Sequence, residues 1–215
     1  MKTFTSLLVL IGFASLGFAE EAKTFFPVSE RGDKTTISSF EEGWYSKHLH
    51  LMEQPSLYAK RGDKSEDVYR FTLLPTWGDP RCAVVTKRGD KADIQFTRLD
   101  GDGGYDPGKL VEKSKRELQP KEIEKFSALF EALEFAKQPT EDPVTGLDGS
   151  QWILERLKDG EYHIVVRWTA DAYDPTKRGT ASFVKLCEWM LATAPKNKNA
   201  EQGGTGQPDP APSRN

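Results

Sequence analysis

Aromatic and cationic side chains come together in two consecutive segments, SQWILERL and EYHIVVRW. The Asp159-Gly160 pair between them is a strong signal for a two-residue hairpin turn. With that turn, Trp152 lies opposite Arg167 on one face of the hairpin. On the same face, Arg156 lies opposite His163. Such a face can hold an anionic or aromatic ligand through ring stacking and charge-assisted hydrogen bonds.

We therefore predict a ligand-binding site on this face, with Asp148 and Trp168 at its edge. The alternative is a structural stack of Arg167 on Trp152, because contacts between cations and rings are common and the open face of a sheet needs cover. The predicted ligand-binding residues are Asp148, Trp152, His163, Arg167 and Trp168.

Three carboxylates lie close together in the segment DGDGGYD, residues 100–106, which suggests a calcium loop. The match to an EF-hand fails. With Asp100 at the first position, Tyr105 stands where the loop requires glycine and Val111 where it requires a bidentate glutamate. We expect an acidic turn here and no metal site.

His48 and His50 are two residues apart, a spacing that places both side chains on one face of a strand, where they could bind a transition metal. On a helix the same two side chains diverge. Because the surrounding pattern is helical and His163 is the only other histidine, we do not expect a zinc site.

Arg-Gly-Asp-Lys occurs three times, at residues 31–34, 61–64 and 88–91. Integrins of animal cells recognise Arg-Gly-Asp in exposed loops, so an adhesive role is one interpretation. The other is turn chemistry, because glycine supplies a positive φ and aspartate bonds its own backbone. We favour turns, and expect no integrin binding.

The sequence contains none of the local motifs of common enzyme classes. There is no GxSxG, no HExxH and no GxxxxGK[ST]. Cys82 and Cys187 do not form a CxxC motif or stand beside a histidine, so neither is a candidate nucleophile. They are either a disulfide pair or two separate buried thiols. No cofactor is expected.

The elements that would position these groups follow from hydrophobic periodicity and turn signals. The spacing predicts a capped helix from Ser38 or Ser39 towards Pro55, a helix from Pro120, and a final helix that buries Cys187. Strands are predicted over residues 68–74, 81–86, 92–99 and 109–118, in addition to the hairpin above. Tight turns impose antiparallel pairing. We predict a single α+β domain, an antiparallel β-sheet with α-helices packed on one face.

The N-terminus has the three regions of a signal peptide, with Lys2, an apolar segment from Leu7 to Phe18, and Ala19 at the cleavage position. We therefore predict a signal peptide over residues 1–19 and a flexible linker over 20–36. The α+β domain is predicted over 37–194. The polar segment 195–215 is predicted to be a disordered tail.

The numbers of charged and apolar residues indicate which classes of partner to expect. The chain carries 30 basic and 33 acidic residues, which leaves no positive excess for a phosphate backbone, so nucleic acid is not expected. Past the signal peptide no segment has the about 20 apolar residues of a membrane span, so no membrane association is expected after cleavage.

The elements WYSKHL, EDVYRF, GGYDPGKL, GLDGSQWILE and YHIVVRW, which span residues 44–191, resemble an uncharacterised family of exported bacterial proteins. The resemblance implies export and a single domain, and transfers no functional residue. We expect a non-enzymatic periplasmic or secreted domain that binds a protein or small-molecule ligand. The alternative is a small hydrolase whose carboxylate or histidine site is assembled by the fold; it would need a concave pocket that holds a group with a shifted pKa.

Overall fold

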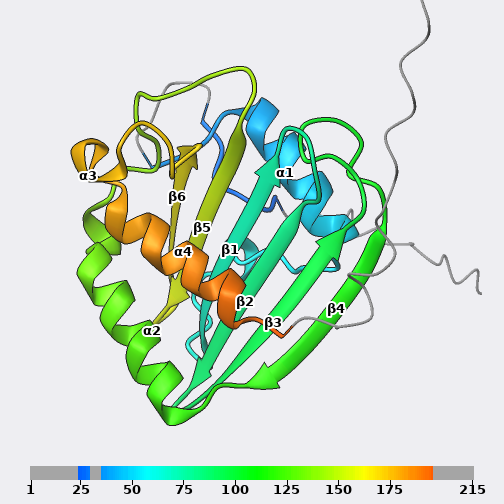
Figure 1. Cartoon of the computed structure of the whole chain (residues 1–215). Helices are drawn as coiled ribbons and strands as arrows, with labels where there is room; N and C mark the ends of the chain where they lie inside the picture. The colour runs from blue at the N-terminus through cyan, green and yellow to red at the C-terminus, as the bar shows by residue number, and fades with distance from the viewer. Residues whose placement is uncertain (1–23, 30–34, 196–215) are drawn as a thin grey trace, which may run out of the picture.

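The structure is a computed structural model that describes residues 24–29 and 35–195. The described residues form one six-stranded antiparallel sheet with the strand order β4-β3-β2-β1-β5-β6 (Figure 1). The strands are β1 Asp67–Pro75, β2 Arg81–Arg88, β3 Lys91–Leu99, β4 Leu110–Glu117, β5 Ser150–Lys158 and β6 Glu161–Trp168. The α-helices are α1 Ser39–Leu51, α2 Pro120–Leu133, α3 Pro175–Arg178 and α4 Ala181–Thr193; the 3-10 helices are η1 Tyr58–Lys60 and η2 Phe135–Lys137. The predicted single-domain antiparallel α+β fold is confirmed.

The predicted hairpin across Asp159-Gly160 forms. Strands β5 and β6 pair with Trp152 opposite Arg167 and Arg156 opposite His163, as the two-residue turn requires. Strands β2 and β3 pair up to Arg88 and Lys91, so the third Arg-Gly-Asp-Lys is a hairpin turn. The second follows η1 and also turns the chain, with Gly62 at a φ of 88°. The first falls at residues 31–34, outside the described residues.

Helices α2 and α4 cover one face of the sheet, where the larger of two apolar cores lies. The sheet contributes alternate residues to this core because side chains alternate between faces along a strand. Helices α2 and α4 each contribute the apolar side chains of the helix face that lies against the sheet. Its fully or almost fully buried members from the sheet and the two helices include Phe71, Ala83, Val85, Ile94, Leu154, Val165, Phe126, Leu186, Cys187 and Met190.

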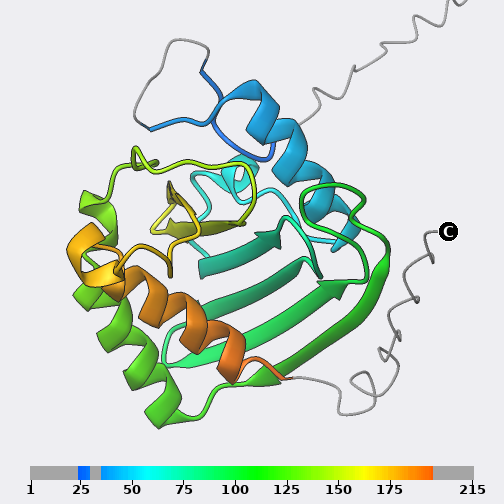
Figure 2. The same ribbon diagram turned by 45° about the horizontal axis from the view of Figure 1, so that its top comes forward.

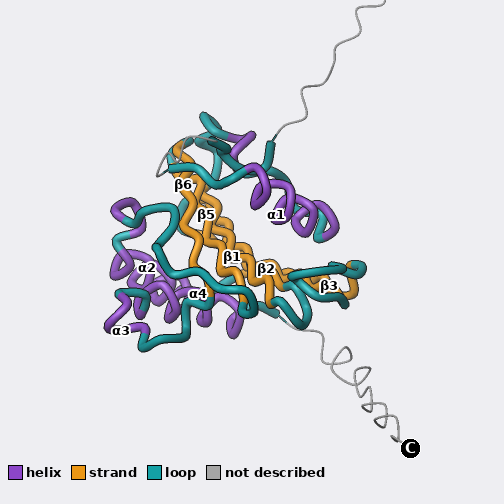
Figure 3. Tube along the Cα trace, turned by 90° about the horizontal axis from the view of Figure 1, so that it is seen from above, coloured by secondary structure: helices purple, strands orange, loops and turns teal. Residues whose placement is uncertain are grey.

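Helix α1 packs on the opposite face, so the helices are divided between two faces rather than gathered on one (Figure 3). The physical reason is that the central strands are apolar at successive positions. Ile153 and Leu154 are both fully buried, although they point to opposite faces. Tyr45 and Leu49 of α1 cover the Ile153 side. The capping box that the sequence predicts is present, between Ser38 and Glu41.

The predicted linker is wrong where the chain is described, because part of it belongs to the core on the α1 face. Phe26 is completely buried and its ring packs edge-on against Tyr45, with centroids 6.0 Å apart. Val28 forms a parallel bridge with Ile37. An aromatic pair, Phe25-Phe26, inside a polar segment is the signal for this packing. Residues 1–23, 30–34 and 196–215 lie outside the described residues, so the predicted signal peptide and nearly all of the predicted tail fall there.

The two cysteines lie on opposite faces of the sheet and are both buried free thiols. Cys82 belongs to the core under α1, whereas Cys187 belongs to the core under α4. The sheet separates them, so they cannot form a disulfide within this fold. Burial raises the pKa of both thiols, that of Cys82 to about 11, which keeps them protonated and unreactive.

A buried ion pair joins two central strands. Arg70 of β1 and Glu155 of β5 are cross-strand partners and are both completely buried. The guanidinium donates from Nε to Oε2 at 2.6 Å and from Nη2 to Oε1 at 2.7 Å. Its Nη1 donates to the carbonyl of Pro55, and the Tyr162 hydroxyl donates to Glu155. Every charged atom is therefore compensated.

Candidate functional site

The predicted ligand face of the β5-β6 hairpin is covered, not open. Trp152 is 5% exposed and Arg167 is 4% exposed. Both lie on the face that α4 packs against, and the Trp152 ring contacts Phe71 and Phe183. The cross-strand geometry is as predicted, but this part of the face has no room for a ligand. These two residues belong to the core.

Arg167 holds the connection between α2 and β5 in place. Its Nη1 donates to the carbonyls of Thr140 and Val166, and its Nη2 donates to the carbonyl of Pro139. Its guanidinium carbon lies 6.0 Å from the centroid of the Phe183 ring. Burial lowers the Arg167 pKa and Asp142 opposes this effect. The ring that Arg167 approaches is thus Phe183, and not Trp152 as the structural alternative proposes.

The other three predicted site residues are dispersed. His163 is half-buried, and its Nε2 lies 3.0 Å from the carbonyl of Gln138. Burial lowers the His163 pKa, which keeps the ring neutral. Asp148 is exposed in the loop before β5, and Trp168 ends β6 with its ring stacked 6.1 Å from that of Tyr173. Of the five, Trp168 lines an open pocket, and that pocket lies on the α1 side of the sheet together with Val166.

The acidic segment 100–106 is a turn whose carboxylates cap backbone groups. Asp100 accepts from the amide of Lys109, Asp102 accepts from that of Gly78, and Asp106 accepts from that of Gly108. His48 is buried on α1 with Nδ1 2.9 Å from the carbonyl of Trp44, and burial lowers its pKa. Across residues 24–29 and 35–195, no group of three or more His, Cys, Asp or Glu side chains could hold a metal ion.

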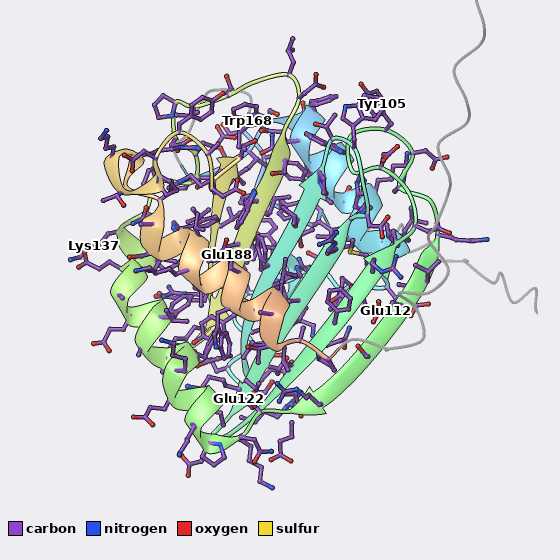
Figure 4. All side chains as sticks on the ribbon, in the orientation of Figure 1. Tyr105, Glu112, Glu122, Lys137, Trp168 and Glu188 are labelled. Carbon is purple, nitrogen blue, oxygen red and sulfur yellow. The ribbon has the colours of Figure 1, made fainter. Side chains whose placement is uncertain are left out.

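Exposed apolar side chains gather at one end of the sheet. Four large ones lie there: Phe40 is 76% exposed, Trp77 65%, Tyr105 59% and Leu147 97%. They come from the start of α1 and from three loops. Tyr105 and Trp168 lie at the same end of the sheet (Figure 4). The connection between α2 and β5, which carries Leu147, runs across this end (Figure 2).

Two adjoining pockets at this end form one open groove, which we call the aromatic groove. The first pocket has a volume of about 590 Å³ and is lined by Phe40, Trp44, Thr76, Tyr105 and Leu147 among others. The second has a volume of about 390 Å³, shares Phe40 and Trp44, and continues to Trp168. The second pocket adds polar groups to the lining, namely Ser38, Glu41, Glu141, Asp142, Thr145 and Gln151.

The walls of the aromatic groove are held from several directions. The indole Nε1 of Trp44 donates to the carbonyl of Gly103 at 2.7 Å, which joins α1 to the β3-β4 loop. The Trp77 and Tyr105 rings stack with their centroids 4.5 Å apart. A side chain at Gly146 would place its Cβ 2.2 Å from the Trp168 ring, so the loop lies directly on that ring. The groove is therefore preformed.

Glu41 and Glu141 form a carboxyl pair in the polar half of the groove. Glu41 is fixed by the capping box, since its Oε2 accepts from the Ser38 amide at 2.9 Å and from the Ser38 hydroxyl at 2.6 Å. Glu141 is fixed by a parallel bridge to Val166. Burial, repulsion by Glu41 and a hydrogen bond between the two side chains raise the Glu141 pKa to about 7. Glu141 therefore gains or loses its proton near neutral pH.

Asp142 anchors the chain next to Glu141. The Arg178 guanidinium donates to both Asp142 oxygens, at 2.9 Å from Nε and 3.1 Å from Nη2. Arg178 also donates to the carbonyl of Thr169. This forked contact is the strongest geometry for an arginine and a carboxylate. It neutralises Asp142 and holds the backbone that presents Glu141.

The carboxyl pair makes stability depend on pH. The Glu141 pKa is raised from 4.5 in an unfolded chain to about 7 in the fold, so the folded state binds the proton more tightly. Its contribution is complete below pH 4.5 and is lost as pH rises through 7. Because residue Glu141 is exposed, solvent screening reduces the change to about 1 kcal/mol.

Glu141→Gln should therefore be more stable than the natural protein at pH 8, by about 1 kcal/mol, and lose this advantage at pH 4.5. Urea unfolding at both pH values measures the difference, and Glu124→Gln, an exposed carboxyl on α2, is the matched control. If Glu141→Gln differs in stability from the natural protein by the same amount at both pH values, the Glu141 pKa is not raised in the fold.

No local pattern in the sequence marks the aromatic groove, because its residues come from five separate parts of the chain. Helical spacing placed Phe40 and Trp44 on one stripe with His48 and Met52. In the fold only the later part of that stripe is buried, and Phe40 is exposed. Aromatic residues in the Gly- and Asp-rich loops at 77 and 105 were a usable signal, since a polar loop does not need them for its own structure.

Comparison of the chain with models of protein families finds no matching family, and comparison with curated proteins finds no match. Across the described ranges, no helix is both long enough and apolar enough to cross a membrane.

Proposed function

We propose that the protein is an exported, non-enzymatic binding domain that acts in the periplasm or after secretion, and that its ligand is a glycan chain bound in the aromatic groove. The observation that carries this proposal is the lining of the groove. Aromatic side chains, Trp44, Tyr105 and Trp168, alternate there with carboxyl, hydroxyl and amide groups.

This lining matches the chemistry of sugars. A pyranose ring has an apolar face of C–H groups that packs on an aromatic ring, while its hydroxyl groups donate to carboxylates and amides at its rim. Glu41, Gln151 and Thr145 supply acceptors beside the rings. Carboxylates at 41 and 141 disfavour a polyphosphate ligand. An entirely apolar partner would leave these polar groups buried without partners.

Binding is tested with the chain from residue 20 to 215 and soluble oligosaccharides of β-glucan, chitin and peptidoglycan, by calorimetry. At least one is expected to bind, and Tyr105→Ala should weaken it about fivefold, since one stacked ring contributes on the order of 1 kcal/mol. Trp44→Phe should retain most of the affinity, because it keeps an aromatic ring.

Tyr58→Ala is the matched control, since it removes a half-buried ring that is not part of the groove. It should leave the affinity unchanged. The proposal fails if the folded protein binds none of the oligosaccharides at millimolar concentration, or if Tyr105→Ala binds as tightly as the natural chain.

Export is supported by Lys2, the apolar segment 7–18 and Ala19. Expression of the full chain in a Gram-negative bacterium should give a periplasmic or secreted product whose measured mass begins at Glu20. A cytoplasmic product that keeps residues 1–19 would contradict this part of the proposal, without affecting the groove.

A hydrolase is the second candidate, and the carboxyl pair is the observation that favours it. A pocket that contains a carboxyl with a pKa of about 7 satisfies the criterion for the enzyme alternative. A carboxyl of this kind can protonate a leaving group while a neighbouring carboxylate activates a water. The hydrogen bond between the Glu41 and Glu141 side chains, however, places them closer than the about 5 Å that a retaining glycosidase needs between its two carboxyls.

Non-enzymatic binding remains the leading proposal, because Glu41 already has a structural role in the capping box of α1. The hydrolase predicts cleavage of a bound oligosaccharide or peptide on incubation, lost at least about a hundredfold in Glu141→Gln while affinity persists. Bound ligand that stays intact for days supports the non-enzymatic proposal.

A further inference from the structure

A second pocket lies on the α2 side of the molecule, next to the hairpin end of β5, and we call it the basic pocket. Its volume is about 450 Å³. Arg156 and Lys158, near the end of β5, line it together with Lys87 from the end of β2. Lys137 also belongs to its rim and lies beside α2, away from Tyr105 and Trp168 (Figure 4). The basic pocket shares no lining residue with the aromatic groove.

The inner wall of the basic pocket is aromatic. Tyr69, Phe126 and Phe135 line it and are almost completely buried, at 4%, 1% and 2% exposure. Their rings, together with Phe130, pack edge to face or tilted, with Tyr69 and Phe126 centroids 5.0 Å apart. The wall is therefore rigid, and Phe130, which also lines the pocket and is half-buried, presents the ring surface that an apolar or aromatic group can reach.

Cations exceed carboxylates around the basic pocket. Lys87, Lys137, Arg156 and Lys158 line it, against Glu131 and Glu134. Lys137 is already paired with Glu134 at 2.5 Å. Lys87 has only a 3.5 Å contact with the hydroxyl of Ser127. The remaining positive charge is available to a ligand.

Arg156 provides the main evidence that the basic pocket binds a ligand. Its guanidinium carbon lies 5.7 Å from the centroid of the Phe135 ring, so it is held against the aromatic wall. Its Nε is buried and has no hydrogen-bond partner among residues 24–29 and 35–195. A buried donor without a partner is unfavourable, and an incoming acceptor would remove that penalty. Guanidinium groups prefer carboxylates and phosphates, which they bind in a forked geometry.

From this geometry we infer that the basic pocket binds a small aromatic anion, a carboxylate or phosphate ester attached to a ring. The anionic group contacts Arg156, with Lys87 and Lys158 at the rim. The ring packs on Phe130, which Tyr69, Phe126 and Phe135 support from behind. The chemistry that the sequence suggests for the β5-β6 hairpin, an anionic or aromatic ligand, is thus placed at the Arg156 end of the hairpin and not at Arg167.

The test uses phenyl phosphate, benzoate and inorganic phosphate as probes on the chain from residue 20, with amide chemical shifts as the readout. Phenyl phosphate or benzoate should bind at least about tenfold more tightly than inorganic phosphate, because only they use the aromatic wall. Which of the two binds more tightly distinguishes a phosphate ester from a carboxylate ligand. The shifted amides should belong to α2 and to the end of β5.

Arg156→Met should weaken binding at least about tenfold, and Arg156→Lys should recover part of it. Arg81→Met is the matched control, since Arg81 is an exposed strand arginine outside the pocket. If Arg156→Met does not fold, Lys158→Met provides the same comparison at the rim. The inference is overturned if neither aromatic probe binds, if inorganic phosphate binds as tightly, or if the arginine and lysine variants bind unchanged.

Discussion

Glu155→Ala is expected to lower the free energy of unfolding by about 3–5 kcal/mol. The substitution leaves the Arg70 guanidinium charged and completely buried, with only the carbonyl of Pro55 to accept from it. It also removes the acceptor of the Tyr162 hydroxyl. Water cannot reach the site to compensate.

Urea unfolding at pH 7 measures this loss. Arg88→Ala is the control, because Arg88 is 51% exposed and its ion pairs with Glu66 and Asp93 should contribute no more than about 1 kcal/mol. The double variant Arg70→Met with Glu155→Leu should recover most of the loss, since replacing both charges by apolar groups removes the uncompensated one. A loss below about 1 kcal/mol for Glu155→Ala would show that the pair is not buried as described.

Trp152→Ala is expected to lower the free energy of unfolding by about 3–5 kcal/mol. The indole is 5% exposed and fills the space between Phe71 of β1 and Phe183 of α4. Its removal leaves a cavity that the sheet and helix cannot close. Its Nε1 also donates to the Ser150 hydroxyl at 2.9 Å.

Trp77→Ala is the matched control, because Trp77 is 65% exposed and stacks only on Tyr105. Its loss should change stability by less than about 1 kcal/mol. Thermal unfolding without any ligand compares the two. If Trp152→Ala is as stable as the natural chain, Trp152 is not a core residue and is again a candidate for ligand binding.

The two proposed sites should bind their ligands independently of each other. The aromatic groove is built from loops and the start of α1, whereas the basic pocket is built on α2 and strand ends. Tyr105→Ala should therefore leave probe binding at Arg156 unchanged, and Arg156→Met should leave glycan binding unchanged.

Local patterns in the sequence were sufficient for most of the fold. The Asp159-Gly160 turn sets the register of β5 and β6, so Trp152 stands opposite Arg167 as predicted. Ser38 and Glu41 mark the start of α1, and Pro120 marks the start of α2. These signals depend on residues within a few positions of each other, and their geometry is the same in any fold.

Contacts between residues that are far apart in the chain could not be predicted from local patterns. A strand pattern shows that Ile153 and Leu154 face opposite sides, but not which helix covers either side. The position of α1 depends on its contacts with Phe26 and with the sheet. The predicted site at Arg167 was closed by α4, a segment that follows it in the chain. The partnership of Arg70 and Glu155 joins residues 85 positions apart.

What the sequence determined by itself is therefore the set of elements, their antiparallel pairing within hairpins, and the near balance of basic and acidic residues. The tertiary structure alone decided which aromatic and charged groups are buried and which remain accessible. Trp152 and Arg167 became core residues, whereas Phe40, Tyr105 and Glu141 came together at one open end. The physical reason is that accessibility is a property of the surfaces that pack together, and residues distant in the chain supply those surfaces.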